Sequence, residues 1–438
     1  MGAVARNETN KGMLREAGAI EALVAMLSPE RAAEEHVAAL GAVCNLVERE
    51  ESAADMLRLQ GGLKRLRPLL ATSDTLRPAH AARVLEHVAS ANQPTKVAMR
   101  VLDLLVPLVG LLSSQTRAAR LSAAGALVHA SRDEATNCTK LREAGAVAAL
   151  MSLLEEEAAA DGGGELEMQS RAAWCLANIA ADPAAAAQLG TVRTGYTPLL
   201  HLLRSEKEQL RRPAAACLFN ATISDGNAPA SLLQVGALTV LISVAGQPGT
   251  NGDVASWAAG AILNMAHRGS GGLLWDELPS DAGLLPVLLE RLRPGEELQN
   301  ANAAGALGNL CAHSEAARLH AVEADAVASL VALLDTSPVS GFAAGALASI
   351  LVEEVGRQAL VLASGVAPLV EILESEDRDT AAAAAVALLN ATAHHPACEL
   401  LLEAGGIPAL LSCLSTATPS VRQPLSPSGP QACWPFHR

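Results

Sequence analysis

The chain has 438 residues, of which 50% are hydrophobic and only 2% aromatic, and it carries a formal net charge of −14 at pH 7. This acidic balance argues against duplex nucleic acid as the main ligand, because that ligand requires a basic footprint. Charged residues, glycine or proline interrupt each apolar run, so a membrane span is not expected, and the first residues lack the apolar core of a secretory signal.

The first structural phrase lies at residues 10–47. A short segment, NKGMLREAG (10–18), precedes residues 19–28, in which apolar residues recur at i, i+3, i+4 and i+7, as on one face of a helix. Pro29 suits the start of a further helix, and HVAALGAVCNLV (36–47) predicts a second buried stripe. We therefore expect each layer to hold two helices and a short leading turn, which cannot bury its apolar faces alone.

The last segment of this phrase recurs at least nine times along the chain. When the copies are aligned on one polar residue, successive gaps are 42, 42, 49, 42, 44, 45, 40 and 41 residues. A period of this size indicates a solenoid of stacked helical units. The aligned residues are Asn45, His87, His129, Asn178, Asn220, Asn264, Asn309, Ser349 and Asn390.

Small residues recur at two places in the phrase. A glycine ends the leading segment in most copies, as in LREAGAI (14–20) and LREAGAV (141–147), and it predicts a sharp break because glycine accepts positive φ. A second small residue lies four positions before the aligned residue, where we expect it to let neighbouring layers approach. These residues are Gly41, Gly125, Ala216, Gly260, Gly305 and Gly345.

The repeat also predicts the organisation of the chain. Residues 1–16 read as a partial N-terminal repeat, and residues 17–415 as the repeat array. The one long gap coincides with acidic residues and a glycine triplet, which predict a flexible loop at 155–169. The Pro- and Ser-rich segment 416–438 predicts a disordered tail.

Eight cysteines occur without any C-x-x-C pair. Several take the place of small apolar residues in the repeated phrase, which predicts buried, reduced thiols and hence a cytoplasmic or nuclear location. The four cysteines concerned are Cys44, Cys175, Cys217 and Cys311.

The pair of phrases AGAI-x-x-LV-x-LL and A-x-GAL-x-NL, at a period near 42, resembles the armadillo repeat over roughly residues 1–415. The resemblance implies an all-α, right-handed superhelical solenoid of about nine to ten repeats, whose third helices line a concave groove. Two copies depart from the family phrase: the second has Arg83 and His87 where Gly and Asn belong, and the third has His129.

The family resemblance also implies a binding groove. An Asn at the same place on each third helix can bind an extended peptide, because a carboxamide both donates and accepts hydrogen bonds. Residues four and seven positions earlier would add specificity. In the alternative interpretation, each Asn bonds local backbone or water and each Trp fills space between layers. The predicted peptide-binding groove consists of Asn45, Trp174, Asn178, Asn220, Trp257, Asn264, Asn302, Asn309, Phe342 and Asn390.

No catalytic constellation occurs in the sequence: G-x-x-x-x-G-K-[ST], G-x-S-x-G and H-E-x-x-H are all absent. We therefore expect no catalysis, cofactor, metal or small-molecule substrate. The chain is more similar to the vacuolar armadillo scaffold and β-catenin-like arrays than to importin-α, which implies a scaffold for extended or helical segments of other proteins. Two alternatives stay open. One is the substrate-recognition part of a ubiquitin-ligase assembly; the other is an importin-like cargo adaptor, although W-x-x-x-N occurs only at Trp174 and Asn178.

Overall fold

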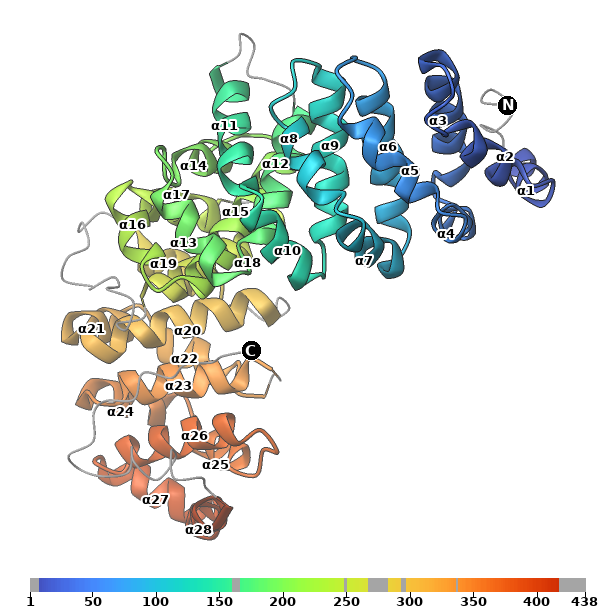
Figure 1. Cartoon of the computed structure of the whole chain (residues 1–438). Coiled ribbons are helices and arrows are strands. Elements are labelled where there is room, and N and C mark those ends of the chain that lie inside the picture. Colours follow the sequence, from blue (N-terminus) through green and yellow to red (C-terminus); the bar gives the residue numbers. More distant parts are fainter. Residues whose placement is uncertain are drawn as a thin grey trace. The chain divides into compact units, whose positions relative to one another are not determined.

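The computed structural model describes residues 8–159, 166–247, 250–266, 283–292, 297–335 and 338–416, and within these residues it contains helices and no strand (Figure 1). The helices are α1 (Glu8–Glu16), α2 (Ala19–Met26), α3 (Ala33–Val47), α4 (Glu51–Leu59), α5 (Gly62–Leu70), α6 (Arg77–Ala91), α7 (Gln93–Val101), α8 (Leu105–Leu111), α9 (Arg117–Ser131), α10 (Ala135–Glu143), α11 (Ala146–Ala159), α12 (Leu166–Ile179), α13 (Pro183–Thr191), α14 (Thr197–Leu203), α15 (Glu208–Ser224), α16 (Ala228–Gln234), α17 (Ala237–Gly246), α18 (Gly252–Met265), α19 (Leu284–Glu290), α20 (Glu297–His313), α21 (Glu315–Glu323), α22 (Ala326–Val331), α23 (Ser340–Ile350), α24 (Glu354–Leu362), α25 (Val366–Ile372), α26 (Arg378–Ala391), α27 (His395–Glu403) and α28 (Gly406–Thr416).

Most layers contain three helices, where the sequence pattern predicted two helices and a leading turn. The leading segment of the first layer is the nine-residue helix α1, and comparable helices open the following layers at α4, α7 and α10. The prediction was wrong on this point because the leading segments are short and polar, so their helical period is weak in the sequence. The helix nevertheless buries one face, as at Ala53, Ala54 and Leu57 of α4.

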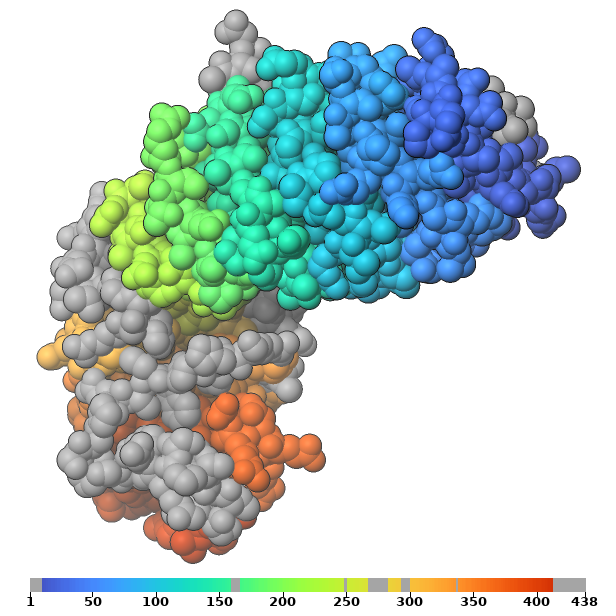
Figure 2. All heavy atoms as spheres, in the orientation of Figure 1, coloured from blue at the N-terminus to red at the C-terminus, as the bar shows by residue number. Residues whose placement is uncertain are grey.

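The chain divides into two compact units, Met1–Asp225 and Gly226–Arg438. In the first unit the third helices α3, α6, α9, α12 and α15 pack successively against one another, and Figure 1 shows α6 beside α9. In the second unit α18, α20, α23 and α26 do the same. Figure 2 shows the layers of the first unit in contact on the face drawn, from blue to green. Each layer thus covers the apolar face that its neighbour could not bury alone.

The core between third helices is built from small side chains. In α9, Ala123, Ala126, Leu127 and Ala130 are all fully buried. Alanine adds little bulk beyond the backbone, so adjacent helices can approach closely and still pack at the density of a protein interior. A core of this kind explains how a chain with so few aromatic residues forms stable layers.

A close backbone approach between two third helices occurs at Gly308 of α20. A Cβ at this position would lie 3.1 Å from Cα of Ala346 in α23. The repeat pattern predicted such a close approach four positions before the aligned residue. This prediction is wrong for Gly41, where a Cβ would meet nothing within 4 Å. At Gly125 the neighbours are long side chains instead of a helix backbone.

The predicted sharp break between the first and second helices of a layer is confirmed. The φ angle is 75° at Gly18 and 82° at Gly145. Where the glycine is missing from the phrase, Asp103 adopts φ 54° and Asp325 adopts φ 61°. Aspartate tolerates this left-handed conformation better than most residues because its short polar side chain bonds locally. The turn is therefore retained in layers whose sequence has lost the glycine.

The helices of the fourth layer extend further than the sequence suggested. The predicted loop at 155–169 is helical at both ends, because α11 continues to Ala159 and α12 begins at Leu166, while residues 160–165 lie outside the described part. The predicted tail at 416–438 also lies outside it, apart from Thr416 at the end of α28.

Two further sequence expectations concern cysteine and the membrane. Cys44, Cys175, Cys217 and Cys311 are buried and unpaired, as predicted, and burial raises the pKa of Cys44 to about 11 and that of Cys311 to about 12. In the described residues no single helix is long and apolar enough to cross a membrane. Two helix pairs with a sharp bend, α16 with α17 and α24 with α25, reach that length and composition only together.

Candidate functional site

The aligned residues form one half-exposed row on the third helices of each unit. We define the first strip as the row in the first unit and the second strip as the row in the second unit. The first strip comprises Asn45, His87, His129, Trp174, Asn178 and Asn220. The second strip comprises Trp257, Asn264, Asn309, Phe342, Ser349 and Asn390.

The asparagines of these strips connect neighbouring third helices. In four of them the side-chain nitrogen Nδ2 donates to a backbone carbonyl oxygen of the preceding third helix. The bonds run from Asn178 to Val128 (3.1 Å), from Asn220 to Ala177 (2.8 Å), from Asn309 to Leu263 (3.3 Å) and from Asn390 to Ala348 (2.8 Å). The carboxamides therefore have a structural role that the sequence analysis held open as an alternative.

This structural role uses only part of each carboxamide. A carboxamide has two N–H donors and an oxygen acceptor. At Asn220, Asn309 and Asn390, one donor bonds the preceding helix, and the described residues leave the second donor and the oxygen without a partner. Asn178 differs because it also donates to Ser131 Oγ at 3.0 Å, so only its oxygen remains. The bond to the preceding helix fixes the direction in which the remaining groups point.

One predicted groove residue does not belong to the strip. Asn302 of α20 is buried, with 7% of its surface exposed, and its Nδ2 donates to the carbonyl oxygen of Ser256 at 2.9 Å. The sequence spacing placed it seven residues before Asn309, but that position turns into the contact with α18. Trp257 and Phe342, at the same spacing in their layers, are half-exposed.

Trp174 already holds a cation from its own chain. The guanidinium carbon of Arg212, on α15, lies 6.0 Å from the centre of the Trp174 ring. This distance is within the range of a cation–π interaction. The indole that W-x-x-x-N would offer to a lysine of a bound peptide is thus partly covered by an arginine of the next layer.

An ion pair crosses the first strip over α9. Arg171 of α12 donates to Glu86 of α6 at 2.8 Å, to Glu167 at 2.7 Å and to the backbone oxygen of Leu121 at 2.9 Å. Gly125 of α9 lies beneath this bridge, and a Cβ there would come within 3.0 Å of both charged groups. The missing side chain at Gly125 therefore makes room for the Arg171–Glu86 bridge.

The ionisable groups around this bridge are only partly solvated. Burial raises the pKa of Glu86, although the neighbouring Arg171 opposes the shift. Burial also lowers the pKa of His129 to about 4, helped by the charges of Arg132 and Arg171, and it lowers the pKa of His87. Both histidines are therefore neutral near pH 7, and arginines supply the positive charge of the first strip.

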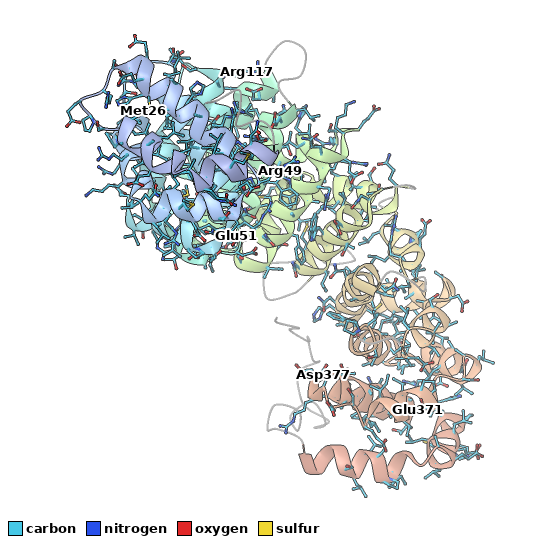
Figure 3. The ribbon with its side chains drawn as sticks, turned by 90° about the vertical axis from the view of Figure 1, so that its right-hand side faces the viewer. Met26, Arg49, Glu51, Arg117, Glu371 and Asp377 are labelled. Carbon is cyan, nitrogen blue, oxygen red and sulfur yellow. The ribbon has the colours of Figure 1, made fainter. Side chains whose placement is uncertain are left out.

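The two units differ strongly in charge. Residues 1–225 hold 24 Lys and Arg and 26 Asp and Glu, a net charge of −2, whereas residues 226–438 hold 8 and 20, a net charge of −12. The acidic residues of the second unit lie largely off its strip, such as Glu371 on α25 and Asp377 before α26 (Figure 3). The six residues of the second strip are all uncharged.

Sequence reasoning missed two features of the first unit. One is the Arg171–Glu86 bridge. Its only signal in the sequence is Gly125, whose copy lies between the copies that carry Glu86 and Arg171. The other is Asn137, a fully buried residue of α10 that joins three helices and has no counterpart in the repeated phrase. In the described residues no cluster of three or more potential metal ligands occurs.

Comparison with known proteins supports the helical fold. An engineered protein solved by the Northeast Structural Genomics Consortium is 28% identical to this chain, with a TM-score of 0.79, and the match covers 92% of this chain and 95% of the other. No family model matches the sequence, and no curated protein matches it. The chain is therefore an all-helical, repeat-like protein with a similar fold to an engineered one.

Proposed function

We propose that the chain is an armadillo-type, right-handed solenoid that acts as a non-catalytic scaffold and binds extended or helical segments of other proteins along its third helices. The observation that carries this proposal is the pre-oriented carboxamide. At Asn220, Asn309 and Asn390 an N–H and an oxygen remain for a ligand, while the other N–H is tied to the preceding helix.

This geometry suits the backbone of an extended segment. A peptide backbone offers both a carbonyl oxygen and an N–H, which match the remaining donor and acceptor of each carboxamide. Because each carboxamide is already held in place, less side-chain entropy is lost when a ligand binds. Trp257 and Phe342 supply half-exposed aromatic surface beside the asparagines, which suits apolar side chains of the same segment.

A double substitution in the second strip tests this function. We expect Asn309→Ser with Asn390→Ser to weaken the affinity for a partner, identified by affinity capture and mass spectrometry, by roughly 5- to 150-fold. The two substitutions each remove hydrogen bonds to the ligand that are worth about 0.5–1.5 kcal/mol. Serine is chosen because Ser349 occupies the same position in the intervening layer. Isothermal titration calorimetry with the purified partner gives the affinities.

Asn302→Ser is the matched control for this experiment. Asn302 lies on the same helix as Asn309 and also bonds the preceding third helix, but it is buried. It should lower the free energy of unfolding without changing the affinity of the folded protein. Equal loss of affinity in the control and in the double variant would assign the asparagines to structure alone.

A further inference from the structure

The charged groups of the first strip point to a particular kind of partner. We propose that the first strip is a docking surface for an acidic extended segment of another protein, and that Glu86 occupies the place of a partner carboxylate on Arg171 in the free chain. This inference rests on the proposed function and adds the chemistry of the partner and an internal competitor.

Arg171 already binds carboxylates in the free chain. Arg171 binds two carboxylates. That of Glu86 comes from α6, two layers away, and that of Glu167 comes from the exposed first turn of α12. The Arg171 side chain is 23% exposed and that of Glu86 is 15% exposed, so the pair lies at the surface of the strip. Both carboxylates contact the same terminal nitrogen of Arg171, Nη2, so a carboxylate that arrives from solvent binds there by replacing one of them.

Two further arginines lie along the first strip near the Arg171–Glu86 bridge. Arg83 is exposed on α6 three residues before Glu86, within one helical turn, and its charge acts on both Glu86 and His87. Arg212 lies over Trp174, one helical turn from Arg171 on α12. The three arginines thus lie on α6, α12 and α15, so an acidic segment along the strip would meet a cation on three of the four third helices from α6 to α15.

The two units differ in net charge, and this difference favours the first unit as the site for an acidic ligand. A net charge of −12 in the second unit repels an acidic ligand, whereas the first unit, at −2, is nearly neutral. Exposed charges interact over about 8 Å at physiological ionic strength, so the charged groups beside a strip determine which ligand it attracts. Among the described residues, the first strip therefore has arginines beside its half-exposed side chains, whereas the six residues of the second strip are uncharged.

Glu86 itself is partly buried and lies across the first strip. Burial raises its pKa, so its ionised form is less well stabilised than a solvated carboxylate. The bridge lies across α9 above Gly125, in the path that a segment running along the third helices would take. A partner carboxylate that replaces Glu86 on Arg171 would leave Glu86 free to turn toward solvent. Glu86 thus lowers the affinity of the first strip until a sufficiently acidic segment displaces it.

Fluorescence anisotropy with labelled synthetic peptides tests the proposal on the full chain. The probes are an extended peptide of alternating Glu and Ser, and matched peptides with Gln or Lys in place of Glu. We expect the wild-type chain to bind the Glu probe more tightly than the other two. Glu86→Ala should increase the affinity for the Glu probe by about tenfold, the size of one charge-assisted hydrogen bond, and Arg171→Met should remove most of the binding.

Glu353→Ala is the matched control, because Glu353 pairs with Arg318 at 2.7 Å in the second unit. It should leave the affinity for the Glu probe unchanged. If Glu86→Ala loses helicity, Glu86→Gln keeps the side-chain volume and is measured in its place, with a smaller gain expected. Equal or tighter binding of the Lys or Gln probe, or no gain in either Glu86 variant, overturns the inference. The proposed function is tested separately by the Asn309 and Asn390 variant in the second unit, so the two can fail independently.

Discussion

Asn137→Ala should destabilise the first unit by about 2–5 kcal/mol, because it removes a fully buried carboxamide that joins three helices. The Asn137 Nδ2 donates to the carbonyl oxygens of Ala130 (2.7 Å) and Lys96 (3.2 Å), and its oxygen accepts from Arg100 at 2.9 Å. Alanine leaves both carbonyl oxygens without this donor in a region closed to water. Each such loss costs more than an exposed hydrogen bond would.

The neighbouring thiol reports this effect locally. Cys138 is 4% exposed, so a thiol reagent reaches it only when the layer opens. We expect its labelling rate, followed by mass spectrometry, to rise by at least about 30-fold in the variant, which corresponds to the lower end of the stability loss. Thr136→Ala, at an exposed position of the same helix, should change the rate little. An unchanged rate at Cys138 in Asn137→Ala would show that these bonds do not hold the layer together.

Gly308→Leu is the second large effect that we expect, with a net loss of about 2–4 kcal/mol of stability. A Cβ added at this position would lie 3.1 Å from Cα of Ala346. The larger leucine side chain must therefore force α20 and α23 apart. The cost of overpacking exceeds the gain of about 1 kcal/mol in helix propensity when glycine is replaced. The labelling rate of Cys311, a buried thiol one helical turn further along α20, measures the opening.

Gly41→Leu is the matched control because the same substitution falls on a third helix where a Cβ meets nothing within 4 Å. Cys44 stands three residues further on, as Cys311 does from Gly308, so the two thiols report the two sites alike. Slower or unchanged labelling of Cys44 is the expected result. Equal destabilisation by both substitutions would contradict the specific close approach at Gly308.

Features that recur in every copy of the repeat could be predicted from the sequence. The row from Asn45 to Asn390 could be placed on one helical face because a fixed period superimposes nine copies of one phrase. The turn at Gly18 could be predicted for the same reason, and Asp103 shows that the layer keeps this turn when the glycine changes. The short first helices were missed because their polar sequences carry little period of their own.

Contacts made only once along the chain could not be predicted in this way. Asn302 has the same spacing as Trp257 and Phe342, yet its side chain is buried in the contact with Ser256. The Arg171–Glu86 bridge spans two layers, and the direction of a long arginine side chain depends on the acceptors around it. Periodicity assigns a residue to a face of the helix, but the bonds that it makes depend on neighbours from other copies.

Site-specific photo-crosslinking tests the central claim, that partners bind along the third helices, most directly. A benzophenone amino acid is placed either at Ser349, in the second strip on α23, or at Ser329, on the second helix α22. The two serines are a matched pair: both are half-exposed, and each donates to the carbonyl oxygen four residues earlier in its own helix. The account predicts that a partner of the purified chain is crosslinked from Ser349 and not from Ser329. Crosslinking from Ser329 alone, or equally from both positions, would contradict it.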